Sequence, residues 1–169
     1  SNTGMKYKRI LSQSHVVLKE FYVDQHLIVK LSNVQGDVHI NGHAIELNNN
    51  STFVVPKFSH ISCSINQLNS QENIELQLLM IDEESISEAF KYISALKQPT
   101  FPTASCSPVY TISTPAIVDQ NFVLFNKLLP SLCGSSIETT LLSQCLVFIL
   151  MALNEAGIDV FNVYRFNYD

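Results

Sequence analysis

The sequence predicts an α+β fold, in which an antiparallel β-barrel is followed by an α-helical part. In the first half of the chain, short segments that alternate apolar and polar residues are separated by turn signals, as in β-sandwiches and barrels. The spacing of the apolar residues then changes from two to about 3.6, which indicates helices. We place the barrel with its first helix at residues 10–97, and a linker with the helical part at residues 98–169.

The clearest local signal lies in residues 36–60. Apolar and polar residues alternate up to Asn41-Gly42, a pair that tolerates the positive φ angles of a two-residue type I′ hairpin turn. A further strand over Phe53–Val55 ends at Pro56, which has no N–H group to donate to a sheet. A hairpin followed by a strand that ends at proline, with a histidine nearby, is typical of a cupin-like barrel.

The other strands are expected over residues 15–23, 26–32, 60–65 and 74–81. Residues 26–32 show the alternation most clearly, because successive side chains of a strand point to opposite faces. One face carries Leu27, Val29 and Leu31, and the other carries His26, Ile28 and Lys30. Residues 97–115 carry four prolines and are expected to form an ordered linker, with a short extended piece over residues 109–112.

Helices are expected at about residues 82–96, 116–129 and 136–155. The first begins with acidic residues, which the helix dipole favours at that end. The third is apolar almost all round, so it should be buried on more than one side. The aromatic segment 160–168 is expected to pack against another part of the protein.

Composition narrows the possible functions. The net charge is −5 and the sequence shows no basic stripe, so the chain by itself is not expected to bind nucleic acid. No apolar run approaches the roughly 18 residues of a membrane span, and no signal peptide is evident, which predicts a cytoplasmic protein. Charged residues make up only 15%, which suggests that another chain or domain covers part of the surface. The scattered cysteines, Cys63, Cys106, Cys133 and Cys145, are interpreted as buried thiols.

No catalytic residues are identified. The sequence contains no nucleophile elbow, Gly-rich phosphate loop or Cys/His signature, so we expect no enzyme activity and no cofactor. His39, His43 and His60 would be the metal candidates, but they lack the His-x-His pair and the following Glu of metal-binding cupins. No metal site is therefore predicted. A cupin enzyme with an unrecognised set of metal ligands remains an alternative, after the two functions described below.

A pocket for a small ligand is more plausible, because a barrel of this size can enclose one small molecule. Its polar and basic candidates are Tyr22, His26, Lys30, Lys57 and His60. The alternative is that these five are ordinary surface residues and that the barrel is packed solid.

With Gly36–Gly42, Phe53–His60 and the two apolar helices, the chain resembles the N-terminal regulatory domain of AraC/XylS-type transcription regulators. The resemblance covers about residues 15–155 and looks closest to the virulence-regulator branch, the ToxT-like, Rns-like and HilD-like proteins. It implies dimerisation, control of virulence-associated genes and a small effector, in some members a fatty acid. DNA would be bound only through a C-terminal domain with two helix-turn-helix units.

Two expectations follow for partners. The first is a homodimer in which the apolar helices meet their own copies, because one barrel cannot cover them on every side. Its candidate residues are Phe122, Phe125, Leu129, Leu142, Leu146 and Ile149. The second is a small-molecule effector, a fatty acid or another small acid, for which Lys30 and His26 are the nearest cations. The alternative is a protein-interaction module that binds no small molecule.

Overall fold

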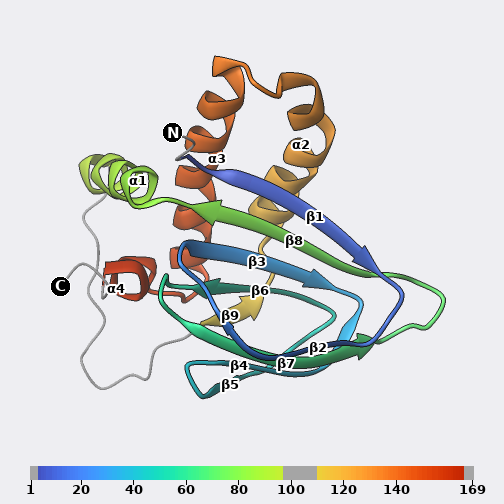
Figure 1. Cartoon of the computed structure of the whole chain (residues 1–169). Coiled ribbons are helices and arrows are strands. Elements are labelled where there is room, and N and C mark those ends of the chain that lie inside the picture. The colour runs from blue at the N-terminus through green and yellow to red at the C-terminus, as the bar shows by residue number, and fades with distance from the viewer. Residues whose placement is uncertain (1–3, 97–109, 166–169) are drawn as a thin grey trace.

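The computed structural model describes residues 4–96 and 110–165, and its strands form two antiparallel sheets that face each other (Figure 1). The five-stranded sheet has the order β1 (Lys6–Ser12), β8 (Ile74–Ile81), β3 (His26–Ser32), β6 (Asn50–Val55) and β9 (Thr111–Ser113). The four-stranded sheet has the order β2 (Val16–Tyr22), β7 (His60–Gln67), β4 (Val34–Ile40) and β5 (His43–Ile45).

The α+β class and the cupin-like antiparallel arrangement are confirmed, although the described strands do not close into a barrel. Successive strands β1 and β2 belong to different sheets and lie at the edge of each one. The expected barrel is therefore a two-sheet sandwich that is open along one edge. The two strands nearest the N-terminus, β1 and β2, form this open edge.

The expected hairpin turn is confirmed, since Asn41 has φ 52° and Gly42 has φ 82°. A second glycine is required for a different reason. Gly36 has φ 128°, and a Cβ added there would lie 2.2 Å from the carbonyl oxygen of Ser64 on the neighbouring strand β7. Only glycine permits this close approach of two backbones.

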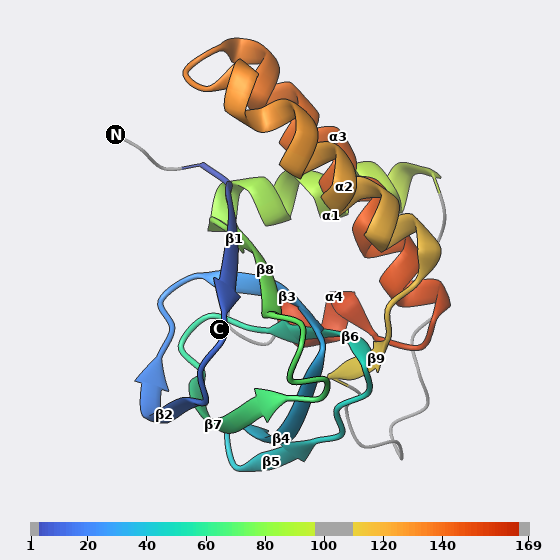
Figure 2. The same cartoon turned by 90° about the vertical axis from the view of Figure 1, so that its right-hand side faces the viewer.

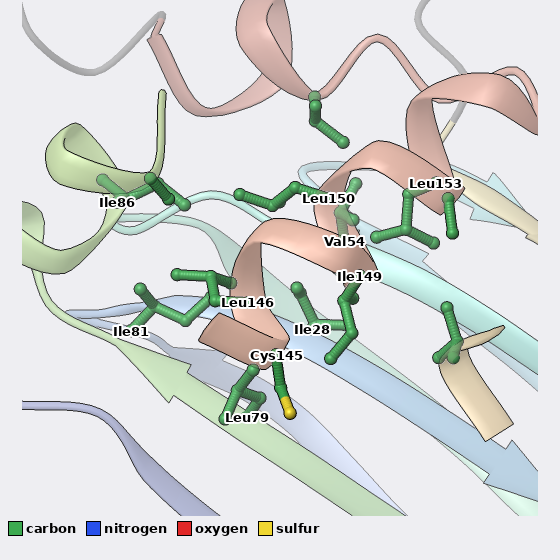
Figure 3. Close-up of a cluster of buried hydrophobic side chains, with 14 of the residues drawn as sticks. Ile28, Val54, Leu79, Ile81, Ile86, Cys145, Leu146, Ile149, Leu150 and Leu153 are labelled. Carbon is green, nitrogen blue, oxygen red and sulfur yellow. The ribbon is translucent and has the colours of Figure 1, made fainter. Parts of the chain in front are cut away.

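The described residues form four helices, α1 (Glu83–Leu96) after β8, and α2 (Ala116–Leu132), α3 (Ser136–Glu155) and α4 (Val160–Arg165) after β9. They cover the face of the five-stranded sheet that points away from the four-stranded sheet (Figures 1 and 2). Side chains from β3, β6 and β8 interlock there with α3, as Figure 3 shows for Ile28, Val54, Leu79, Leu146 and Ile149.

Helix α3 has the length and mean hydropathy of a membrane-spanning helix, 20 residues at 1.7. The sequence expectation concerned a different criterion, an unbroken apolar run of about 18 residues, and α3 has no such run because its longest apolar stretch is residues 145–153. In the fold, Leu146, Ile149 and Leu150 of α3 are fully buried against the sheet and its neighbouring helices. Its hydropathy is thus used in the protein core, as the all-round apolar pattern predicted.

Two elements were not predicted as regular structure. Strand β1 lies in a segment that is rich in lysine and arginine, which hides the alternation. Helix α4 falls in the segment expected to be an aromatic tail, and Tyr164 is indeed completely buried. The expected extended piece appears as β9, which pairs with β6. Residues 97–109 of the linker, with Cys106, and residues 166–169 of the tail lie outside the described residues, and the division at residues 97/98 stays a prediction.

Candidate functional site

The two sheets enclose an apolar interior, and we call the faces that line it the inner faces. On the five-stranded sheet they carry Leu27, Val29 and Phe53, and on the four-stranded sheet Val38 and Ile40, all buried. Because paired residues of neighbouring strands point to the same side, the strand registers identify the inner residues of the edge strands as well.

Inner side chains remain exposed where β1 and β2 form the edge. Ile10 pairs with Leu76 in the inner row of β8, yet it is 46% exposed. Leu18 pairs with Cys63 and Phe21 pairs with Ile61, and these two edge residues are 40% and 51% exposed. We call this region the open edge. Its wall is completed by partly buried residues of β7 and β8, namely Ile61, Cys63, Leu76, Leu78 and Met80.

Two cations lie at the open edge. Lys6 pairs with Met80 and Lys8 pairs with Leu78, so both share the inner face of β1 with Ile10. Both lysines are exposed. The open edge therefore offers apolar surface for the body of a small molecule and positive charge for an acid group.

The five residues predicted for the ligand pocket do not converge there. His26 and Lys30 lie on the face of β3 that points to the helices, and both are buried. Tyr22 and His60 pair on the outer face of the four-stranded sheet, with ring centres 5.2 Å apart. The predicted set is thus distributed over two faces of the molecule, outside the inner compartment.

His26 belongs to a buried cluster between β3, α1 and α4. The Lys57 amide donates to its Nδ1 at 3.1 Å, its Nε2 lies 3.4 Å from a carboxylate oxygen of Glu83, and Lys57 forms an ion pair with the same carboxylate. The ring also meets Tyr164 edge to face at 4.9 Å. Burial lowers the pKa of His26 to about 4, against the opposing effect of Glu83 and with a smaller lowering from Lys57. This histidine is a neutral structural residue at pH 7.

Lys30 lies in a second polar cluster, under α2. Its Nζ is 3.0 Å from a carboxylate oxygen of Asp119 and 3.4 Å from the Ser32 hydroxyl. Asn50 also donates to the Asp119 carboxylate, at 3.3 Å and 3.4 Å. The charge of Lys30 is therefore already compensated within the fold, and it does not point into the inner compartment.

Lys57, the last of the five, lies 4.9 Å from the centre of the Phe58 ring, which stacks on Tyr22. The described residues contain no group of three or more His, Cys, Asp or Glu side chains that could hold a metal ion. His39, His43 and His60, the metal candidates of the sequence, lie on the four-stranded sheet, where His60 contacts the ring of Tyr22 and His43 contacts the ring of Tyr110.

The six residues predicted for dimerisation do not lie on the exposed surface of the chain. Five of the six are buried inside the chain, and the sixth is half-buried against the same core: Phe122, Phe125, Leu142, Leu146 and Ile149, and Leu129. The physical reason is that the five-stranded sheet, together with α1, α4 and the contact between α2 and α3 themselves, covers the apolar stripes of α2 and α3. The apolar residues that α2 and α3 leave exposed are others: Ile117, Val123, Leu124, Leu128, Ile137 and Phe148.

Phe148 forms a ridge between two grooves on this exposed helix face. A groove of about 900 Å³ lies between α2 and α3, and one of about 630 Å³ lies between α1 and α3. Phe148 and Met151 line both grooves. Among the residues that line the larger groove, Glu155 is the charged one.

The residues of the open edge were missed from the sequence because β1 was not recognised. The available signal was the alternation of Lys6, Lys8 and Ile10 with Tyr7 and Arg9, which only becomes readable once the register with β8 is known. Leu18 and Phe21 were missed as a pair because a β-bulge between them places residues three apart on one face.

Comparison with known proteins adds sequence and fold relatives. No protein-family model matches the chain. The urease operon transcriptional activator of Escherichia coli is 39% identical over 166 residues, which cover 98% of this chain and 56% of the activator. The chain thus spans about half the length of this curated relative.

Crystal structures of ToxT from Vibrio cholerae share the fold at low sequence identity. An apo ToxT variant has a TM-score of 0.68 at 10% identity, over 93% of this chain and 58% of ToxT. A ToxT structure described as bound to an unsaturated fatty acid has a TM-score of 0.54 at 11% identity, over 90% of this chain and 55% of ToxT. By its sequence along nearly its whole length and by its fold, the chain resembles the regulatory domains of AraC-type transcription regulators.

Proposed function

We propose that this chain is the ligand-sensing and dimerising half of an AraC-type transcription activator that acts in the cytoplasm. DNA is bound by a separate domain with helix-turn-helix units in the full-length protein, at promoters of virulence-associated genes. The relative in Escherichia coli activates the urease operon, which supports a role in activation. The net charge of −5 supports the assignment of DNA binding to the other half.

The observation that carries ligand sensing is the open edge. Ile10, Leu18 and Phe21 face the inner compartment but stay in contact with solvent. Exposed apolar surface of this kind commonly marks a binding site. With Lys6 and Lys8 beside it, the site suits a molecule with an apolar body and an acid group. The ToxT structure described as bound to an unsaturated fatty acid supports this class of ligand.

Calorimetric titration with oleate tests the proposal. We expect binding by the unmodified chain and at least tenfold weaker binding by Phe21→Glu, because a carboxylate at that position opposes both an apolar chain and an anionic head. Tyr22→Glu is the matched control, since Tyr22 is also 51% exposed on the same strand but points to the outer face. Equal affinities for the two variants would contradict the assignment of the site.

Lys6 and Lys8 are tested together in the same titration. Replacing both with Gln should weaken oleate binding roughly tenfold, the scale of a charge-assisted hydrogen bond. Lys30→Met is the comparison, because Lys30 is paired with Asp119 on the other face of the sheet. If neither the unmodified chain nor any variant binds oleate, that result supports the second candidate function. This function is a protein-interaction module that binds no small ligand.

We further propose that the chain forms a homodimer through the exposed helix face. Phe148 is 56% exposed and stands between two grooves, so two copies related by a two-fold axis can each insert Phe148 into a groove of the other. Phe148→Asp should lower the mass measured by light scattering at micromolar concentrations. Ile137→Asp is the control, because Ile137 is an exposed apolar residue of the same helix outside the residues that line the grooves.

A further inference from the structure

The outer edge of β2 is a second surface that the fold leaves unexplained. Among the described strands β2 pairs with β7 on one side, so its other side presents free N–H and C=O groups. Every residue from Val17 to Tyr22 is exposed. Such an edge is a ready template for pairing with another strand, and proteins usually protect it.

Apolar side chains project from both faces of this edge strand. Leu18 and Phe21 point to the inner face, whereas Val17 and Tyr22 point to the outer face. Between the two apolar pairs the register with β7 passes over Lys19 and Glu20. The strand thus reads as two apolar residues, one cation, one anion and two apolar residues.

This order is complementary to itself when reversed. We propose that β2 pairs antiparallel with β2 of a second copy, about a two-fold axis that passes between Lys19 and Glu20. Lys19 then lies opposite the partner's Glu20, and Glu20 lies opposite the partner's Lys19. Opposite charges that face each other across two strands stabilise their pairing, and like charges oppose it.

The apolar residues fall into the same register. Leu18 lies opposite the partner's Phe21, and both belong to the inner face. Val17 lies opposite the partner's Tyr22, and both belong to the outer face. The bulge is what makes this agreement possible, because it places Leu18 and Phe21 on one face although they are three residues apart.

Charged residues and bulges on an edge strand often prevent association. In β2, the charged residues and the bulge do not prevent association with one specific partner, which is a second copy of β2. A strand with a lysine but no adjacent glutamate could not form an ion pair with a second copy of itself. Because Lys19 and Glu20 are adjacent, the two-fold axis places each of them opposite the oppositely charged residue of the partner, which gives two ion pairs. The surface therefore excludes most strands and accepts a second copy of itself.

The pairing also completes the open edge. It places the partner's Leu18 and Phe21 beside the exposed inner side chains of β2 and extends the apolar wall. This consequence rests on the proposed ligand site, whereas the strand pairing itself does not. Helices α2 and α3 lie on the opposite side of the five-stranded sheet from β2, so contact through the helices leaves this edge accessible (Figure 2).

Charge reversal in the Phe148→Asp background tests the pairing without contribution from the helix face. Sedimentation equilibrium should show residual dimerisation of Phe148→Asp, weakened roughly tenfold by adding either Lys19→Glu or Glu20→Lys, since each creates two like-charge contacts. The double reversal, Lys19→Glu with Glu20→Lys, should restore the original affinity. An equimolar mixture of the two single reversals should also associate, because each copy then supplies the charge that the other lacks.

Three results would overturn the pairing: no residual dimer of Phe148→Asp at any concentration, single reversals that change nothing, or a double reversal as weak as the singles. Circular dichroism confirms that each variant is folded before its mass is measured by sedimentation equilibrium. Failure of the helix dimer has a different signature. In that case Phe148→Asp with an unmodified β2 has the same mass as the unmodified chain.

Discussion

The Tyr164 hydroxyl donates a hydrogen bond of 2.7 Å to the Leu27 carbonyl oxygen, across 137 residues of sequence. Leu27 belongs to the inner face of β3, and Tyr164 belongs to α4 on the opposite side of the same sheet. Phe161 of α4 also stacks on Phe90 of α1 at 4.8 Å. The backbone that lines the inner compartment is thereby connected directly to the last described helix.

Removing that hydroxyl should destabilise the chain without changing the shape of the core. Tyr164 is completely buried, so Tyr164→Phe leaves the contact with His26 intact and removes one buried hydrogen bond. We expect a loss of about 1–2 kcal/mol in the free energy of unfolding by urea. Tyr92→Phe, at a residue that is 63% exposed, should change it by less than about 0.5 kcal/mol.

Stability should fall as the pH drops from 6.5 to 4 because of His26. Its pKa is about 4 in the folded chain against 6.5 for an ordinary histidine, so in this window the unfolded state binds more protons. The contribution of His26 is complete above pH 6.5 and is lost progressively down to pH 4, by ~3 kcal/mol in all.

Urea unfolding at several pH values measures this effect. Carboxylates also titrate in this pH range, and the His26→Gln variant, which keeps all of them, measures their contribution to the pH dependence. The unmodified chain should lose more stability between pH 7.5 and 4.5 than the variant does. His15→Gln is the matched control at an exposed site and should follow the unmodified chain. Parallel curves for all three proteins would show that folding does not lower the pKa of His26.

The Lys30–Asp119 ion pair should respond unequally to loss of its two members. Lys30 is 8% exposed, whereas the Asp119 side chain is 38% exposed. Asp119→Asn leaves a buried ammonium group without its counter-charge and should cost about 1–2 kcal/mol. Lys30→Met leaves a carboxylate that water can reach, so the cost should be smaller. Urea unfolding that shows the reverse order would contradict the burial of Lys30.

Two glycine substitutions should differ sharply. Gly36→Ala places a Cβ 2.2 Å from the Ser64 carbonyl oxygen at a φ of 128°, and we expect it to cost ~3 kcal/mol or more. Gly42→Ala, at a φ of 82° with no other atom within 4 Å of the new Cβ, should cost only about 1 kcal/mol. Thermal denaturation of the two variants measures the difference, and similar costs would mean that β4 and β7 can separate at Gly36.

Features of the fold that depend only on neighbouring residues could be predicted from the sequence. Asn41-Gly42 defines its turn because both residues accept positive φ angles, and the alternation in β3 and β8 assigns their two faces. The acidic start of α1 and the apolar run of α3 likewise follow from local preferences. These signals need no knowledge of what lies across the fold.

Which apolar and charged residues are available for function depends on long-range packing and could not be predicted from local sequence. Phe125 and Leu146 look like interface residues until the five-stranded sheet buries them, and His26 and Lys30 look like ligands until the helices cover that face of β3. Conversely, β1 becomes recognisable only through its register with β8, and Phe21 becomes an inner residue only through the bulge in β2. Burial depends on long-range pairing, and long-range pairing is set by the whole chain rather than by any one segment.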